Sequence, residues 1–174
     1  MPNTVLKVVQ STSINKAAAK REQLREQLWP GFSAELWDRK KEKGFCTIPR
    51  TLPLIMTLID LLGEKGKDSS RVYFDLWSRA FDDYCIEVSD EEEFAFSSGY
   101  DAPTRNVRSW KERITVLEKL GFIHIAPKGS RRFGYILLLD PHKVVKKLHQ
   151  LGKVPPNWWG AYTKRATDIG CTLP

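Results

Sequence analysis

Residues 104–123 read TRNVRSWKERITVLEKLGFI, and residues 127–134 read PKGSRRFG. The large apolar residues of the first stretch recur every three or four positions: Val107, Trp110, Ile114 and Leu117. This spacing predicts a helix with one face in a core, and Gly121 suits its end. The second stretch lies between two apolar segments and predicts the turn of a β-hairpin with strands over 122–126 and 132–139. We therefore expect a helix followed directly by a hairpin with a basic tip.

The chain has 174 residues and a net charge of +7, but its charge is unevenly distributed. Residues 104–174 carry 14 Lys and Arg against 4 Asp and Glu, a net charge of +10. Residues 46–103 carry 5 against 12, and residues 1–45 carry 9 against 5. The basic segment thus coincides with the predicted helix and hairpin. A concentrated positive field of this kind attracts the phosphates of nucleic acids.

Composition argues against several other classes of protein. A hydrophobic fraction of 41% is typical of a folded chain. No apolar run approaches the roughly 20 residues that span a membrane, and the N-terminus lacks the pattern of a secretory signal. Three cysteines far apart in sequence, Cys46, Cys85 and Cys171, indicate reduced thiols and a cytoplasmic location. His142 and His149 are too far apart to share a metal ion, so we expect no metal and no cofactor.

The densest acidic run has a structural explanation. Residues 89–93 read SDEEE, which predicts a capping box in which Ser89 and Glu92 exchange hydrogen bonds at the start of a helix over 90–98. The carboxylates also favour the positive end of that helix dipole. Gly99 suits the left-handed residue that ends the helix. We expect capping here rather than a cation site.

The remaining pattern predicts a mostly α-helical chain. Thr51 is expected to cap the helix over 52–62, and Ser69 or Ser70 is expected to cap the helix that runs to about Phe81. Helices are expected over 13–29, 52–62, Ser69 or Ser70 to Phe81, 101–120, 142–151 and 157–168, and further short strands over 46–49 and 85–88. These elements divide into a helical arm and linker (1–44), a compact domain (45–152) and a C-terminal aromatic helix (153–174). That last helix is expected to dock on the core or on a partner subunit.

Two helices and a basic hairpin in this order resemble the winged helix-turn-helix superfamily. The residues that carry the resemblance are Phe94-Ala95, Gly99, Ile114, Leu117, Gly121-Phe122-Ile123 and the basic wing. The layout is similar to that of bacterial transcription regulators and plasmid replication initiators, and it covers roughly residues 45–140. The resemblance implies a mostly α fold with a small antiparallel β-hairpin. It also implies that helix 104–120 enters the major groove of DNA and that wing 127–133 lies on the backbone.

The resemblance can be aligned in two registers that differ by about one turn. When the family pattern is aligned on Leu117 and Gly121, Trp110 falls where such regulators usually carry a small aliphatic residue. When the pattern is aligned on Gly99, Val107 or an earlier residue falls at the position of the small aliphatic residue. In either case the second helix is longer than usual at its N-terminal end, where base contacts would be made.

Outward positions on this helix supply the candidate DNA contacts. They are Thr104, Arg105, Arg108, Ser109 and Lys111. Arg105 and Arg108 suit guanine edges because the guanidinium fork matches O6 and N7, and the other three suit phosphate oxygens. The alternative is a solvated helix face on which Arg108 pairs with Glu112, four residues later.

The hairpin tip supplies the second set of candidates. They are Lys128, Ser130, Arg131 and Arg132, which suit a phosphate backbone or a minor groove. The alternative is an ordinary hairpin with solubilising charges. The next helix carries three lysines that would either extend the basic surface or form a solvent-exposed helix face: Lys143, Lys146 and Lys147. Trp158, Trp159 and Tyr162 would either stack on unpaired bases or, as we favour, dock the last helix.

These observations lead to a functional hypothesis. We expect a cytoplasmic double-stranded DNA-binding protein, either a transcription regulator or a plasmid replication or partition accessory factor. We expect a homodimer held by one or both terminal helices, with no membrane partner and no small-molecule ligand. The alternative is a winged-helix module for protein contacts. We do not expect an enzyme, because the nucleotide-binding, metalloprotease and hydrolase motifs are lacking.

Overall fold

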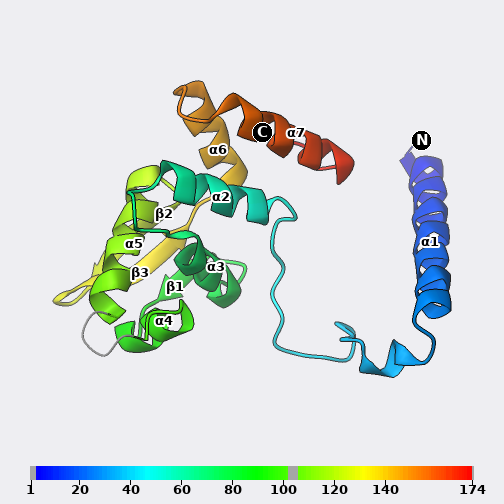
Figure 1. Cartoon of the computed structure of the whole chain (residues 1–174), viewed down its shortest axis with the longest axis horizontal. Coiled ribbons are helices and arrows are strands. Elements are labelled where there is room, and N and C mark those ends of the chain that lie inside the picture. The colour runs from blue at the N-terminus through cyan, green and yellow to red at the C-terminus, as the bar shows by residue number, and fades with distance from the viewer. Residues whose placement is uncertain (1–2, 102–105, 174) are drawn as a thin grey trace. The chain divides into compact units, whose positions relative to one another are not determined.

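The computed structural model describes residues 3–101 and 106–173. The chain divides into two compact units, Met1–Phe45 and Cys46–Pro174. Figure 1 shows the helices and strands of each unit. None of the helices described is both long and apolar enough to cross a membrane.

The first unit is dominated by one long helix. Helix α1 spans Asn3–Leu28, and the 3₁₀ helix η1 spans Phe32–Glu35. The expected start at residue 13 was therefore wrong by ten residues, because no glycine or proline interrupts the chain between Asn3 and Leu28. Leu24 and Leu28 are 53% and 57% exposed, so the described residues of the first unit do not bury this apolar side.

A three-stranded antiparallel sheet lies at the centre of the second unit. Strands β1 (Cys85–Glu87), β2 (Ile123–Lys128) and β3 (Arg131–Leu138) follow the order β1-β3-β2. The expected hairpin is confirmed as β2 and β3, and β1 pairs with the free edge of β3. The expected strand over 46–49 was wrong. Pro49 has no N–H for a strand ladder, and Ile48 remains 40% exposed.

The described part of the second unit also contains six α-helices (Figure 1). They are α2 (Leu52–Leu62), α3 (Ser70–Arg79), α4 (Glu91–Ser97), α5 (Asn106–Leu120), α6 (Pro141–Gln150) and α7 (Pro156–Asp168). The expected mostly α fold with a small antiparallel sheet is confirmed at this level. The start expected for α5 at residues 101–103 falls mostly outside the described residues.

One core joins α2, α3, α5 and the sheet. Its largest fully buried side chains include Trp110, Tyr73, Phe122, Ile55 and Leu76. The aromatic ring of Tyr73 packs edge-on against that of Phe122, with ring centroids 5.3 Å apart. Each helix contributes one apolar face, as its 3.6-residue period requires. Burial of these faces supplies the main stabilisation of the second unit.

Helix caps differ from those expected. Asp90, not Ser89, is the N-cap of α4, and its carboxylate accepts hydrogen bonds from the N–H groups of Glu92 (2.9 Å) and Glu93 (3.5 Å). The Ser89–Glu92 capping box was wrong because the extended chain continues beyond β1, where the N–H of Val88 donates to Gly134. The Thr51 hydroxyl also makes no capping bond.

Helix α3 is capped from outside its own sequence. One carboxylate oxygen of Asp60 accepts from the N–H groups of both Ser69 (2.8 Å) and Ser70 (2.9 Å). The hydroxyl of Ser69 instead donates to the carbonyl of Lys67. An acid on α2 therefore satisfies two of the free donors at the start of α3 and ties the two helices together.

The last helix packs on its own chain. The indole N–H of Trp158 donates to the carbonyl of Leu54 at 2.9 Å, and the Tyr162 hydroxyl lies 2.6 Å from Nδ1 of His142. Trp158 and Tyr162 are buried, so these two rings are not free to stack on bases. Trp159 stacks on His149, with ring centroids 3.7 Å apart. Helix α7 thus belongs to the second unit.

Candidate nucleic-acid interface

Helix α5 is oriented by a ring of aromatic side chains. Trp110 is fully buried, and its ring meets Phe94 of α4 and Phe133 of β3 edge-on, with centroids 5.9 and 6.1 Å away. Ile114 and Leu117 continue the same buried face. The helix is therefore held between α4 and the hairpin, and the opposite face, which carries Arg108 and Glu112, points outward.

The outward cations of α5 are paired with acids. Nε of Arg108 lies 3.2 Å from Oε1 of Glu112, which is the ion pair expected for a solvated helix face. The Arg108 side chain is still 81% exposed. Nζ of Lys111 lies 2.6 Å from Oε2 of Glu91 on α4 and 5.7 Å from the Phe133 ring centroid. Arg108 is thus accessible to a ligand, whereas Lys111 is drawn toward α4.

The other candidate DNA contacts on this helix are less exposed or lie outside the described residues. Ser109 is half-buried, and its carbonyl accepts a hydrogen bond from Arg113 at 3.1 Å. Arg113 also donates to the carbonyl of Gly66 at 3.1 Å, so it holds α5 to the loop before α3. Thr104 and Arg105 lie outside the described residues.

The basic wing is held against the sheet by its own cations. Lys128 pairs with Glu87 of β1, and this hydrogen bond holds the pKa of Lys128 above its usual value. The guanidinium of Arg131 donates to the carbonyls of Val88 (3.3 Å) and Ser89 (3.0 Å). Ser130 sits exposed in the turn between β2 and β3. Lys128 and Arg131 therefore brace the wing and are only partly available to phosphates.

Arg132 is the freest described cation of the wing. Its side chain is 68% exposed, and its guanidinium is 3.9 Å from Oε2 of Glu118, at the limit of an ion pair. The guanidinium also lies 5.1 Å from the centroid of the Phe133 ring. A weak ion pair and a cation–π contact position the group without neutralising it.

A groove between α5 and the wing brings part of the predicted site together. It has a volume of about 510 Å³. Its lining residues are Val107, Arg108, Lys111, Glu112, Thr115, Arg132 and Phe133. The predicted residues Arg108, Lys111 and Arg132 thus share one groove, whereas Lys128 and Arg131 face β1. The lining holds three cations and one acid, and Glu91 and Glu118 pair with Lys111 and Arg132 from outside it.

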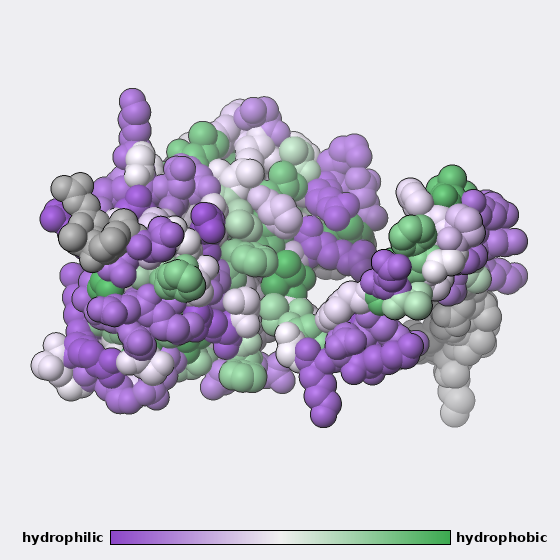
Figure 2. Space-filling view, turned by 60° about the horizontal axis from the view of Figure 1, so that its bottom comes forward, coloured by the Kyte–Doolittle hydropathy of each residue, from purple (hydrophilic) through white to green (hydrophobic). Residues whose placement is uncertain are grey.

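The surface around the folded core is mixed in character. Hydrophilic residues cover most of the left side of the view in Figure 2, and hydrophobic residues gather near its centre. Several large apolar side chains are exposed, among them Phe81 (83%) and Phe96 (69%).

Sequence reasoning missed the acids that face the candidate cations. Glu87, Glu91 and Glu118 come from β1, α4 and the C-terminal half of α5. Only Glu112 carried a local signal, through its spacing of four from Arg108. Glu87 meets Lys128 because β1 and β2 flank the same strand, and that pairing has no signature in the sequence.

Comparison of the chain with protein-family models, with curated proteins and with solved structures finds no match. Among the described residues, no group of three or more His, Cys, Asp or Glu side chains is arranged to hold a metal ion.

Proposed function

We propose that this protein binds double-stranded DNA as a winged helix-turn-helix protein, with the N-terminal half of α5 in the major groove and the wing on the backbone. The observation that carries the proposal is the groove that joins Arg108 and Lys111 of α5 to Arg132 of the wing. A transcription regulator or a plasmid replication or partition factor fits this activity. Free thiols at Cys46, Cys85 and Cys171 suit the cytoplasm.

The order of the elements supports this proposal. Helices α4 and α5 follow each other after a turn at Gly99, whose φ of 86° is in the left-handed region. The hairpin of β2 and β3 follows α5 directly, and β1 adds a third strand beside β3. Two consecutive helices followed by a hairpin form an arrangement suited to groove and backbone contacts together.

The ion pairs of the interface are compatible with DNA binding. Exposed pairs contribute only about 0–1 kcal/mol, since both charges remain hydrated. A phosphate can therefore replace Glu112 beside Arg108 at small cost. Its binding also releases the counterions of the duplex, which is favourable at low salt. Lys111 and Lys128 lie closer to their paired carboxylates than Arg108 and Arg132 do. We therefore expect them to contribute less to DNA affinity.

A salt titration tests the proposal. Binding to a random-sequence duplex, followed by fluorescence anisotropy, should weaken steeply as salt increases. Arg132→Ala should lower the affinity and reduce the slope of log K against log salt concentration by about 0.9, because one phosphate contact is lost. Lys164→Ala is the matched control, since Lys164 is exposed on α7 and already pairs with Asp168 at 2.9 Å. An unchanged slope for Arg132→Ala would contradict the assignment of the wing.

A second function is favoured by one observation. Phe96 is 69% exposed at the end of α4, next to acids in the first turn of the same helix. Large exposed aromatic residues are enriched at protein interfaces. The same titration separates the two functions, because a module for protein contacts would show little affinity for duplex at any salt concentration.

We also propose a homodimer, held by α1 rather than by α7. Helix α7 buries Trp158 and Tyr162 within its own chain, whereas Leu24 and Leu28 of α1 remain exposed. Replacing both leucines with aspartate should convert the dimer to a monomer at tens of micromolar, as measured by light scattering. Gln27→Glu is the control, since it adds one charge on the same helix without removing apolar surface. A wild-type protein that is already monomeric would refute the dimer.

A further inference from the structure

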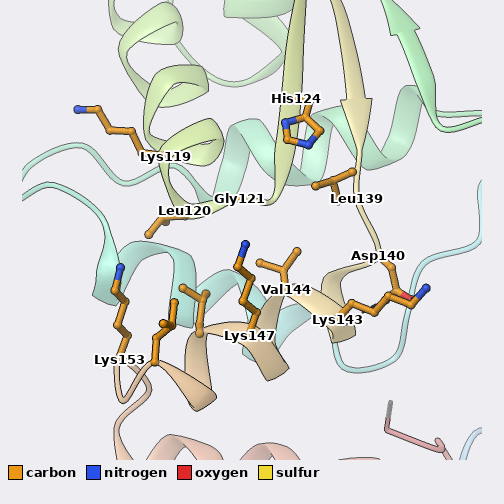
Figure 3. A pocket seen from close by; sticks show the side chains of 12 residues that line it. Lys119, Leu120, Gly121, His124, Leu139, Asp140, Lys143, Val144, Lys147 and Lys153 are labelled. Atoms are coloured by element: carbon orange, nitrogen blue, oxygen red, sulfur yellow. Dashed lines mark hydrogen bonds and ion pairs between the residues drawn. The ribbon is translucent and has the colours of Figure 1, made fainter.

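A second hollow lies away from the groove between α5 and the wing. It has a volume of about 560 Å³ and is formed where the end of α5, the sheet and α6 meet. Figure 3 shows α6 on one side and the turn at Gly121 on the other. The size falls within the range of small-ligand sites, roughly 300–1,000 Å³.

The floor of this hollow is apolar. Leu120 and Leu139 line it from the side of α5 and the sheet, and Val144, Leu148 and Leu151 line it from the side of α6. Leu151 is 59% exposed, and Leu120 and Leu139 are only half-buried. Val144 and Leu148 are already buried, so the remaining apolar surface is that of Leu151, Leu120 and Leu139, and an apolar group that covered it would be stabilised by the hydrophobic effect.

Two lysines of the hollow form no ion pair with the described residues. In Figure 3 the side chain of Lys147 extends from α6 into the space below Gly121, and the amine of Lys153 borders the same space. The other lysines are engaged elsewhere. Nζ of Lys119 lies 2.7 Å from Oε1 of Glu64, and Nζ of Lys143 lies 3.9 Å from Oδ2 of Asp140. Lys119 and Lys143 also point away from the space in Figure 3.

We propose that this hollow binds a small amphiphilic anion, with an acidic headgroup at Lys147 and Lys153 and an apolar body on the leucine floor. An anion would neutralise two amines that border one space, and the leucines would bury its hydrocarbon part. A DNA backbone would satisfy the lysines but would leave the apolar floor uncovered. The site is independent of the proposed DNA binding, because it lies at the C-terminal end of α5 and not at Arg108 and the wing.

Octanoate, octyl phosphate and octanol are suitable probes, because they share a hydrocarbon chain and differ in the headgroup. We expect octanoate to bind the full-length protein in roughly the millimolar range, as a ligand of its size allows. Amide chemical-shift changes in NMR spectra should map to α6 and Gly121. Both anions should bind about tenfold more tightly than octanol, since only they engage the two amines. The tighter of the two anions identifies the headgroup as carboxylate or phosphate.

Two lysine variants separate the hollow from general charge effects. Lys147→Met keeps the apolar stem and removes the charge, and it should weaken octanoate several-fold while leaving octanol unchanged. Lys146→Met is the control, because Lys146 is exposed on the same helix but does not line the hollow. Leu151→Ser should weaken all three probes. Equal binding of octanol and octanoate, or equal effects of the two lysine variants, would overturn the proposal, whether or not the protein binds DNA.

Discussion

Replacing Trp110 with alanine is expected to lower the free energy of unfolding by about 3–5 kcal/mol. Trp110 is fully buried between α4, α5 and β3. Removal of the indole leaves a cavity that Phe94 and Phe133 cannot fill without losing their own contacts. Chemical denaturation followed by circular dichroism measures the change. The variant should also bind duplex more weakly, because the cavity loosens the contact of α5 with the wing.

Two control substitutions separate the loss of buried packing at Trp110 from the loss of a tryptophan at any position. Trp110→Phe should cost clearly less than alanine, because it keeps one ring and removes an indole N–H that finds no acceptor among the described residues. Trp37→Ala should have little effect, since Trp37 is 63% exposed. A loss below about 1 kcal/mol for Trp110→Ala would show that this residue does not anchor α5.

Gly134→Ala is expected to destabilise the protein by about 1–3 kcal/mol, the usual cost of overpacking. Gly134 is buried in β3, opposite a shift of register between Ala126 and Lys128 of β2. An added Cβ would lie 2.8 Å from Cα of Lys128 and still closer to its backbone nitrogen. A clash with backbone atoms cannot be relieved by a change of side-chain rotamer. The two strands must therefore separate, and the wing must move with them.

Gly160→Ala is the matched control for this change. A Cβ at Gly160 would meet nothing within 4 Å, and the residue lies inside α7. Alanine should raise the free energy of unfolding there by about 0.5–1 kcal/mol. NMR spectra should show shifts of the β2 and β3 amides for Gly134→Ala alone. Unchanged stability and unchanged hairpin shifts would indicate that the register between β2 and β3 adapts without strain.

Local patterns determined much of the second unit. The helix expected over 52–62 has the bounds of α2, and the helix expected over 142–151 differs from α6 by one residue at each end. The apolar face of α5, including the burial of Trp110, also follows from the spacing of its residues. Periodicity and turn residues act within a few positions of the chain, so a single sequence carries this information directly.

Helix caps depended on tertiary structure, because neighbouring residues compete for the same N-cap position. Ser89 and Asp90 are both good N-caps, and the sequence could not rank them. The structure selects Asp90, since Val88 is still engaged with β3 when the chain leaves β1. Asp60 caps α3 from nine residues away, a distance at which no local rule applies.

The composition of the candidate site was determined by the sequence only in part. The basic residues of α5 and the wing could be named from charge and helical spacing alone. Whether each cation is free depended on the tertiary structure, which places Glu87 beside Lys128, Glu91 beside Lys111 and the carbonyl of Ser89 beside Arg131. The physical reason is the range of the interactions. Helical periodicity and turn preference act between neighbours in sequence, whereas these contacts depend on strand order and on the packing of α4 against α5, which only the folded chain establishes.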